Sequence, residues 1–263
     1  MALEDARVLV TGAASGLGAA LTDRLRAAGA RVLATDLVAD SPGSAGGGGD
    51  YLRLDITSDA DWAAAVNWVE EQWGGLDVLV NNAGVAGGGR IDVSTIDEWR
   101  WITEINLFGV VRGTRAFTPM FKRQGSGRIV NVASLAGLVH PAGMGSYNAV
   151  KAAVVAFTET TGHELAAYGV HAHVVCPSYF RTNLMDSLQG ADAAVGEVMS
   201  RLVQGAPYTA DDIASAVLEA IERGDELIVP DDAARFAYEL KRDDRPAYDA
   251  MMRKQARKLE GTA

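Results

Sequence analysis

Short apolar runs alternate with longer alanine- and leucine-rich stretches through most of the chain. The apolar runs are rich in β-branched residues and predict strands at residues 7–10, 31–35, 51–54, 76–80, 128–132, 170–175 and 226–229. The stretches between them have helical character, including a long segment from Ile96 to about Arg123. Because strand–helix units repeat before the later strands, the pattern predicts an α/β fold with a doubly wound parallel sheet flanked by helices.

The chain is expected to form a single domain with a helical addition at its end. Residues 1–230 contain all the predicted strands and are expected to form the catalytic domain. Residues 41–49 are rich in glycine and serine and are followed at once by a strand, which predicts a flexible surface loop. Residues 231–263 continue as two helices separated at Pro246, and they are expected to cover either the cleft or a neighbouring subunit. The candidate packing residues there are Phe236, Tyr238, Leu240, Tyr248, Met251 and Met252.

A glycine-rich turn follows the first predicted strand. Residues 11–18 read Thr-Gly-Ala-Ala-Ser-Gly-Leu-Gly, and a helical stretch comes directly afterwards. Strand, glycine turn and helix together predict a Rossmann-type phosphate cradle, because glycines let backbone N–H groups approach a pyrophosphate at a helix N-terminus. The spacing is one residue longer than the usual fingerprint, and a purely structural turn is the alternative. The cofactor-binding residues predicted here are Gly12, Ser15, Gly16, Leu17 and Gly18.

The second strand ends at Asp36, about 20 residues after the glycines, where an acidic residue commonly binds the ribose hydroxyls of a dinucleotide. A carboxylate there repels a 2′-phosphate, and neither Ser15 nor Leu37 is basic. The sequence therefore favours NAD over NADP; the alternative for Asp36 is a turn or capping carboxylate. Asp55, with Ile56 beside it, follows the third strand and is expected to accept from the adenine amino group or to act as a turn residue.

The fourth predicted strand runs into Asn82, Ala83 and Gly84. The Asn side chain suits a tight turn, and the small residues would let a ring or ribose lie against the chain. Asn106 lies inside the long helical segment, where asparagine is a mediocre helix former. It is either a structural hydrogen-bonder or part of a polar site, because a buried amide needs a partner.

The pattern Tyr147-x-x-x-Lys151 is the strongest candidate for a catalytic acid–base pair. Residues four apart share one helix face, so the phenol and the ammonium are expected to lie close together. A nearby positive charge would lower the pKa of the phenol towards the range useful for acid–base catalysis. Ser134 follows a predicted strand and is expected at the carboxyl edge of the sheet, where ligands bind in open α/β folds. The alternative is an aromatic and a charged residue at ordinary helical spacing.

Composition narrows the possible partners. The 263 residues carry a formal net charge of −10, which argues against a broad nucleic-acid or anionic-membrane surface. No apolar run approaches the roughly 20 residues needed to span a membrane, and the first residues lack a secretory signal pattern. A single cysteine, Cys176, fits a reducing compartment. These features predict a cytoplasmic protein that acts on a small molecule.

Taken together, these motifs resemble the classical short-chain dehydrogenase/reductase family, from Arg7 to Thr182 continuously. The resemblance implies that Ser134 and Tyr147 hydrogen-bond the substrate oxygen, and that Tyr147 passes the proton. It implies that Lys151 lowers the tyrosine pKa and holds the nicotinamide ribose, while Asn106 fixes a water connected to Lys151. Pro177, Phe180 and Thr182 would complete the cofactor site. The family also suggests a homodimer or homotetramer.

The sequence departs from the family pattern at Ser178, where glycine is usual, and this puts the local backbone in doubt. Residues 183–206 are expected to act as a substrate lid, with a core-facing amphipathic helix as the alternative. Their apolar side chains suggest a lipophilic substrate. The weaker substrate-contact predictions are Leu135, His140, Met144, Ser178, Leu184, Met185 and Leu188.

We therefore expect an NAD-dependent oxidoreductase that interconverts a secondary alcohol and a ketone. A regulatory or scaffold protein that keeps the fold without turnover is one alternative. An epimerase or dehydratase that retains NAD is another. His171-x-His173 has a spacing that metals can use, but no third ligand is evident and no metal site is predicted.

Overall fold

The computed structural model describes residues 4–39 and 49–261. Apart from Gly49, the predicted surface loop at residues 41–49 lies outside the described residues. The strands are β1 (Arg7–Thr11), β2 (Arg31–Asp36), β3 (Tyr51–Arg53), β4 (Val78–Asn81), β5 (Gly127–Val132), β6 (Val170–Val175) and β7 (Leu227–Ile228). The α-helices are α1 (Gly16–Ala27), α2 (Asp59–Trp73), α3 (Ile96–Thr103), α4 (Gly109–Gln124), α5 (Ala136–Val139), α6 (Gly145–Leu165), α7 (Ala193–Gln204), α8 (Ala210–Arg223), α9 (Asp232–Asp243) and α10 (Arg245–Leu259).

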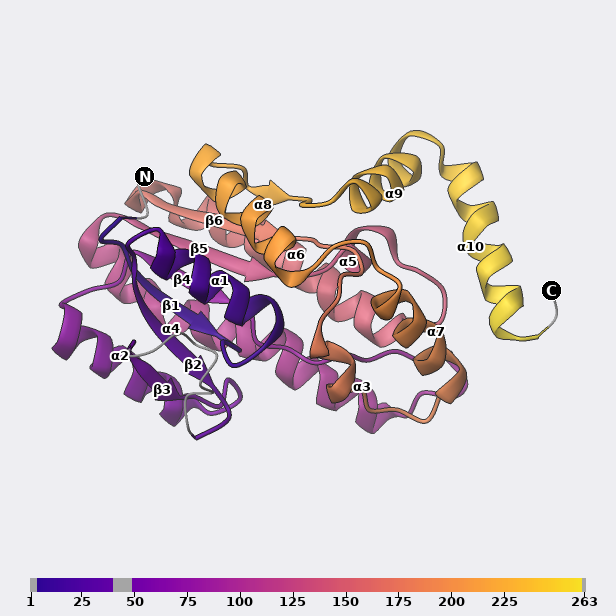
Figure 1. Cartoon of the computed structure of the whole chain (residues 1–263), viewed down its shortest axis with the longest axis horizontal. Coiled ribbons are helices and arrows are strands. Elements are labelled where there is room, and N and C mark those ends of the chain that lie inside the picture. The colour runs from indigo at the N-terminus through magenta and orange to yellow at the C-terminus, as the bar shows by residue number, and fades with distance from the viewer. Residues whose placement is uncertain (1–3, 40–48, 262–263) are drawn as a thin grey trace.

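All the strands pair in parallel in one sheet, in the order β3-β2-β1-β4-β5-β6-β7 (Figure 1). The chain builds outwards from β1 in one direction through β2 and β3, and from β4 in the other direction. The predicted doubly wound Rossmann-type fold is therefore confirmed. The order reverses between β1 and β4, so the turns that follow these two strands flank the crevice in which such folds bind ligands.

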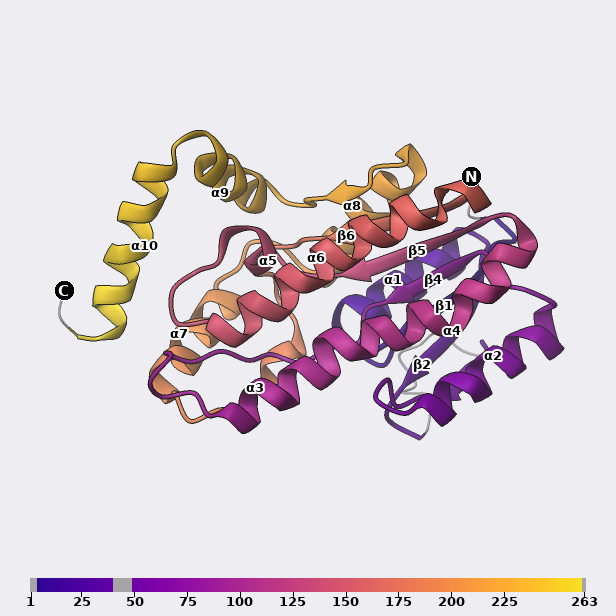
Figure 2. The same cartoon turned by 180° about the vertical axis from the view of Figure 1, so that it is seen from behind.

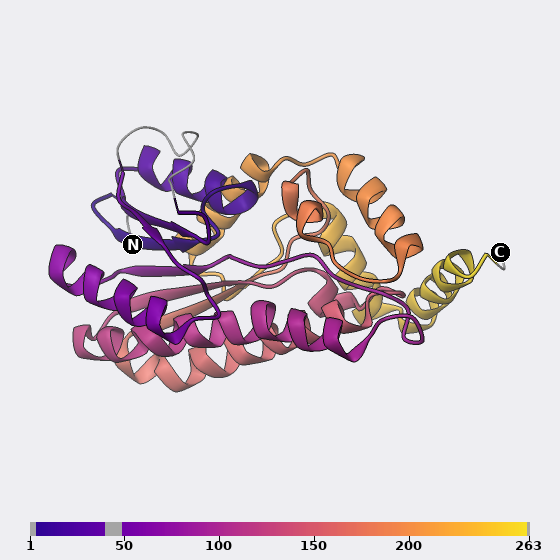
Figure 3. The same cartoon turned by 90° about the horizontal axis from the view of Figure 1, so that it is seen from below.

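Helices cover both faces of the sheet (Figure 3). Alternate strand residues point to opposite faces, so Val8 and Val10 pack under α1 and α8, while Leu9 packs under α2 and α4. On the second face, Phe117 and Phe121 of α4 are fully buried against the sheet. Figure 2 shows α2, α4 and α6 in front of that face. Because both faces are covered, the strands read as almost continuous apolar runs.

The long helix predicted from Ile96 to Arg123 has an interruption. It consists of α3, a π-helical turn at Glu104–Phe108, and α4. Thr95 begins it with a capping box, in which Thr95 Oγ1 accepts from Glu98 N at 3.2 Å and Glu98 Oε2 accepts from Thr95 N at 3.2 Å. The π turn carries Asn106, and π turns often occur at functional sites.

The end of the chain forms two further helices beyond the carboxyl edge of the sheet. Helices α9 and α10 project beyond the last strand at one end of the molecule (Figure 1). Pro246 lies in the first turn of α10, which agrees with the predicted separation of two helices. Tyr248 is buried and its hydroxyl donates to Val139 O in α5, while Lys241 Nζ donates to Leu138 O. The extension is thereby attached to the rim of the cleft.

Candidate active site

A cavity of about 670 Å³ lies along the carboxyl edge of the sheet. Its walls come from the segments that follow β1, β2, β3, β4, β5 and β6, together with residues of α6, α7 and α10. Asp36 lies at the β2 side of this cavity, and Tyr147 and Lys151 lie on α6. The same cavity thus joins the predicted dinucleotide cradle to the predicted acid–base pair.

The glycine turn forms one wall of the cavity. Gly12 and Gly16 have φ of +67° and +54°, which favour glycine. A Cβ on Gly16 would lie 2.7 Å from Thr182 Oγ1, and one on Gly12 would lie 2.8 Å from Ala83 Cα. The turn therefore needs glycine both for its conformation and for close approach by neighbouring segments.

Gly18 belongs to the same turn but does not line the cavity. A Cβ there would lie 2.1 Å from Gly12 O and 2.6 Å from Asn82 Nδ2. Gly18 permits α1 to pack closely against the turn, so its effect on any cofactor is indirect. The other predicted residues of the turn, Gly12, Ser15, Gly16 and Leu17, do line the cavity.

Asn82 ties the ends of β1 and β4 together. Its backbone N and the N of Ala83 both donate to Thr11 Oγ1 at 3.0 Å, and its side-chain amide donates to Thr11 O at 2.9 Å. These bonds fix the segment Asn82–Gly84, which lines the cavity as predicted.

Asp36 acts as the turn carboxylate that was one of its two expected roles, and its binding of a ribose stays a prediction. Its carboxylate accepts from Ala14 N at 2.9 Å and from Leu37 N at 2.7 Å, and it also lines the cavity. Among the described residues that line the cavity, Lys151 is the only lysine or arginine. Asp55 lines the cavity too, but Oδ1 accepts from Thr57 N at 2.9 Å and Thr57 Oγ1 at 2.7 Å, as expected of a turn residue.

Asn106 is fully buried behind the cavity rather than on its wall. Its side-chain oxygen accepts from Val85 N at 2.8 Å, and its amide donates to Val85 O at 2.9 Å. The structural hydrogen-bonding role expected for Asn106 is therefore confirmed. Since Val85 lines the cavity, Asn106 holds part of its wall in place, and its role towards a water near Lys151 stays a prediction.

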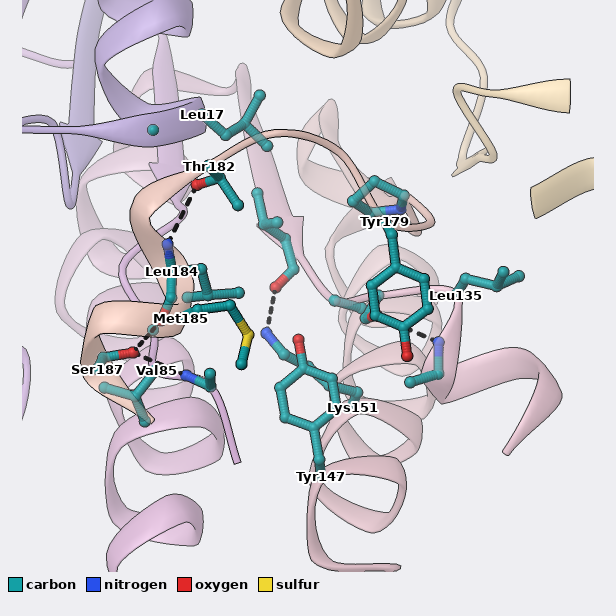
Figure 4. A pocket seen from close by; sticks show the side chains of 18 of the residues that line it. Leu17, Val85, Leu135, Tyr147, Lys151, Tyr179, Thr182, Leu184, Met185 and Ser187 are labelled. Carbon is teal, nitrogen blue, oxygen red and sulfur yellow. Dashed lines mark hydrogen bonds between the residues drawn. The ribbon is translucent and has the colours of Figure 1, made fainter. Parts of the chain in front are cut away.

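Tyr147 and Lys151 meet at the other end of the cavity, one helical turn apart on α6 (Figure 4). Their exposed fractions are 7% and 5%. Lys151 Nζ donates to Val132 O at 3.0 Å and lies 5.7 Å from the centre of the Tyr147 ring. Ser134 lines the cavity beside them, and its Oγ accepts from Ala136 N at 3.1 Å.

The expected pKa of Tyr147 needs correction. Burial raises the pKa of Tyr147 to about 12, although a hydrogen bond with Ser134 acts in the opposite direction. Burial also lowers the pKa of Lys151 to about 8. Desolvation disfavours the charged form of both groups, and it outweighs the predicted effect of the ammonium on the phenol. The protein alone therefore holds Tyr147 protonated at neutral pH.

The segment after β6 brings the remaining predicted cofactor residues to the cavity. Pro177, Phe180 and Thr182 all line it. Ser178 is not among the non-glycine residues with positive φ in the described chain, which are Asp5 and His140, so serine fits this position without strain.

Most of the weaker substrate predictions also lie on the cavity wall: Leu135, Met144, Ser178, Leu184 and Met185. His140 and Leu188 do not line it, and their contact with a substrate stays a prediction. His140 has φ of 57° and is exposed, and its Nδ1 accepts from Lys241 Nζ at 2.8 Å, so it joins α5 to α9. Leu188 lies towards α7, where a Cβ on Gly196 would be 3.0 Å from Leu188 Cδ2.

The predicted lid divides into two parts. A 3₁₀ turn at Asn183–Ser187 lines the cavity with Leu184 and Met185. Helix α7 buries Val195, Met199 and Val203 and exposes Leu202. This is the core-facing amphipathic helix that was considered as the alternative to a lid. Met199 and Val203 also reach the cavity wall.

Several cavity residues were not predicted as site residues: Tyr179, Met199, Val203, Ala237, Tyr248, Met251, Met252 and Gln255. Four of them belong to α10, which was expected only to pack over the cleft or a neighbouring subunit. The sequence did contain one indication that this helix packs against the cavity. The apolar residues at positions 248, 251 and 252 are spaced so that they lie on one helix face.

The paired histidines of β6 have different surroundings. His171 is exposed, whereas His173 is buried and its Nδ1 lies 2.7 Å from Asp225 O. Within residues 4–39 and 49–261, no group of three or more His, Cys, Asp or Glu side chains could hold a metal ion. Cys176 is a free, buried thiol, and burial raises its pKa to about 12. No helix in the same ranges combines the length and apolarity needed to cross a membrane.

Comparison with known proteins agrees with the geometry of this cavity. Residues 6–193 match the family model described as short chain dehydrogenase. The chain belongs to this family. It is 37% identical over 183 residues to a 3-alpha-(or 20-beta)-hydroxysteroid dehydrogenase of Mycobacterium bovis, covering 68% of this chain and 70% of the relative.

Two further relatives differ in their nicotinamide cofactor. An NADP-dependent (R)-specific alcohol dehydrogenase of Lentilactobacillus kefiri is 35% identical over 202 residues, covering 73% of this chain and 79% of the relative. The crystal structure of a short-chain dehydrogenase/reductase from Burkholderia phymatum in complex with NAD superposes with a TM-score of 0.86 at 29% identity. That match covers 94% of this chain and 96% of the other. The short-chain dehydrogenase described here is thus an oxidoreductase acting on CH–OH groups with a nicotinamide cofactor.

Proposed function

We propose that the protein is an NAD-dependent oxidoreductase that interconverts a secondary alcohol and a ketone on an apolar substrate. One observation carries the proposal: a single cavity joins the Asp36 carboxylate to the buried pair Tyr147 and Lys151. The first group suits the ribose hydroxyls of a dinucleotide, and the second suits proton exchange with a substrate oxygen.

The cavity residues fit a nicotinamide dinucleotide. Gly12 and Gly16 form a turn with no room for a Cβ beside Ala83 and Thr182, and the turn opens directly into the N-terminus of α1, where a pyrophosphate is favoured. Asp36 would accept from the adenosine ribose, and Lys151 would hold the nicotinamide ribose. When bound, the nicotinamide supplies the hydride chemistry.

The side chains at the α6 end orient the substrate and move its proton. Ser134 and Tyr147 hydrogen-bond the substrate oxygen, which places the carbinol carbon. Because Tyr147 is protonated at neutral pH, its hydroxyl donates the proton to the oxygen when a ketone is reduced. In the oxidation direction the phenolate must accept the proton, and the Lys151 ammonium stabilises that phenolate below a pH of about 8.

Charge favours NAD over NADP. Asp36 lies on the cavity wall, and the neighbouring Leu37 is apolar and 58% exposed. A 2′-phosphate at this position would face a carboxylate with no basic side chain beside it among the described cavity residues. The NADP-dependent relative from L. kefiri makes this preference a point to test.

An apolar substrate fits the other half of the cavity. Met144, Met185, Met199, Val203 and Met252 line it, and most of them come from α7 and its neighbouring segments. A polyol or sugar would leave several hydroxyl groups without partners against such a wall. The hydroxysteroid dehydrogenase relative is consistent with a bulky apolar substrate.

The test is titration of the purified protein with NADH and NADPH separately, followed by nicotinamide fluorescence, and then turnover on a panel of secondary alcohols. We expect tighter NADH binding and oxidation of apolar alcohols in preference to polyols. A preference for NADPH contradicts the assignment of Asp36, and activity confined to charged polyols or sugars contradicts the apolar substrate.

The same experiment separates the alternative functions. Cofactor binding without turnover on any alcohol or ketone would indicate a regulatory or scaffold protein. Nucleotide that copurifies with the protein, together with no net NADH production, would indicate an epimerase or dehydratase cycle. Location in the cytoplasm, assembly as a homodimer or homotetramer, a mobile lid at 183–206 and the division at residue 230 stay predictions.

A further inference from the structure

A second phenol faces the reacting end of the cavity. Tyr179, in the segment after β6, reaches into the cleft beside Tyr147 (Figure 4). Burial is the main cause of the raised pKa of Tyr147, and an electrostatic interaction with Tyr179 adds to it, so the two phenols lie near each other. A substrate whose oxygen contacts Tyr147 therefore lies within the neighbourhood of the Tyr179 hydroxyl.

The Tyr179 hydroxyl has only a weak partner in the described chain. It lies 3.6 Å from Met144 Sδ, and a thioether sulfur is a poor acceptor. Burial raises the pKa of Tyr179, so the phenol stays protonated and available as a donor. Tyr179 is half-buried, and among the described residues its hydroxyl has no strong acceptor, which a tyrosine shielded from water usually finds.

Tyr248 provides an internal comparison. It also lines the cavity, but its hydroxyl donates to Val139 O and attaches α10 to α5. The Tyr248 hydroxyl is therefore used by the fold itself. Packing alone would be served equally well by phenylalanine at position 179, so the hydroxyl of Tyr179 is available for a ligand.

The wall beyond Tyr179 is rich in methionine. Five of the seven methionines of the chain line this cavity: Met144, Met185, Met199, Met251 and Met252. They come from the segment before α6, from the 3₁₀ turn, from α7 and from α10. Methionine is flexible and polarizable, so such a wall accommodates apolar groups of varied shape.

We propose that Tyr179 is a substrate-binding residue that donates a hydrogen bond to a second acceptor oxygen near the reacting carbon of an apolar ketone or alcohol. The methionines receive the apolar remainder of that substrate. The proposal rests on the proposed function and names the substrate class more closely: a β-keto ester, or the matching β-hydroxy ester, in place of a simple ketone or alcohol.

The experiment compares two probes of equal chain length, hexyl 3-oxobutanoate and 2-undecanone. Both present a methyl ketone with an apolar tail, and only the ester has a second carbonyl beside it. We expect the wild-type protein to prefer the keto ester by about fivefold in kcat/KM, since one additional hydrogen bond contributes roughly 1 kcal/mol. Tyr179→Phe should remove that preference, mainly through KM, and leave 2-undecanone within about twofold.

The control is Tyr238→Phe, the same change at a half-buried tyrosine of α9 that does not line the cavity. It should leave the ratio of the two probes and the binding of NADH unchanged. A Tyr179→Phe variant that keeps the preference, or that loses activity equally on both probes, overturns the proposal.

Binding of the same two probes by calorimetry separates this proposal from the proposed function, because it needs no turnover. If wild-type protein binds the keto ester more tightly than the ketone and Tyr179→Phe does not, the hydrogen bond from Tyr179 to the second oxygen is supported even where neither probe is reduced. If wild-type protein binds both probes equally, the role proposed for Tyr179 is wrong, whatever the outcome of the cofactor titrations.

Discussion

Asp231 accepts two hydrogen bonds from Ser178, one from its backbone N at 2.9 Å and one from its hydroxyl at 2.6 Å. The same carboxylate accepts from Ala234 N at 2.9 Å and thereby caps α9. Asp231 is 2% exposed, so these contacts are shielded from water. One buried side chain thus ties the cavity segment after β6 to the start of the C-terminal extension.

Replacing Asp231 with alanine should lower the free energy of unfolding by about 2 kcal/mol. Loss of a helix cap costs about 1 kcal/mol, and a buried donor left without a partner costs at least as much. Urea unfolding measures the change. Asp232→Ala is the matched control, since Asp232 is exposed and pairs with Arg235 at the surface. Equal stability of the two variants would contradict the role of Asp231.

Tyr147→Phe should reduce turnover by at least about a hundredfold, because general acid–base catalysis contributes 10²–10⁴-fold. The ring remains, so packing and NADH affinity should change little. Steady-state kinetics and fluorescence titration measure the two quantities. Tyr168→Phe is the control, because Tyr168 is exposed and lies away from the cavity. Retention of most of the activity by Tyr147→Phe would remove the proton-transfer role.

Asp36→Asn should reduce the difference between the affinities of the protein for NADH and for NADPH. The amide oxygen can still accept from Ala14 N, whereas the amide nitrogen cannot accept from Leu37 N, so the charge is removed together with one of the two backbone bonds. We expect NADPH to bind about tenfold tighter, corresponding to roughly 1.4 kcal/mol of removed repulsion, and NADH to bind more weakly. Parallel fluorescence titrations measure both affinities, with Asp50→Asn as a control outside the cavity. An unchanged NADH-to-NADPH ratio would mean that Asp36 does not select the cofactor.

Features set by local spacing could be predicted from the sequence. Gly12 and Gly16 follow a strand and precede a helix, and Tyr147 and Lys151 lie one helical turn apart, so their positions depend on few long-range contacts. Parallel strands bring the ends of β1, β4 and β5 to one edge, which explains why distant motifs meet at one cavity.

Features set by long-range packing could not be predicted. Tyr248 and Met251 reach the cavity because α10 is held beside α5 by the Tyr248 hydroxyl, and no local pattern determines that direction. His140 was expected beside the substrate, but its left-handed φ turns this part of the chain towards Lys241. The raised pKa of Tyr147 depends on burial, which the Tyr-x-x-x-Lys spacing does not reveal.

The pKa of Lys151 gives a prediction for stability as a function of pH. Burial lowers it from 10.5 to about 8, so between these values the unfolded chain holds a proton that the folded protein lacks. Stability therefore rises with pH through this window, because the unfolded state binds more protons. Below pH 8 the folded protein must carry a buried ammonium, which is the unfavourable condition.

Lys151→Met should remove this dependence. The difference in unfolding free energy between wild type and Lys151→Met should shift by about 1 kcal/mol in favour of the wild type from pH 7 to pH 9, since one pKa unit corresponds to about 1.4 kcal/mol. Urea unfolding without cofactor at both pH values measures it, and subtraction of the variant cancels groups common to both chains. Lys122→Met, which removes a lysine above the exposed Tyr168 ring, is the control and should show no such shift. If the difference for Lys151→Met is the same at both pH values, Lys151 titrates near its ordinary pKa, and its ammonium is available to Tyr147 at pH 9 as well as at neutral pH.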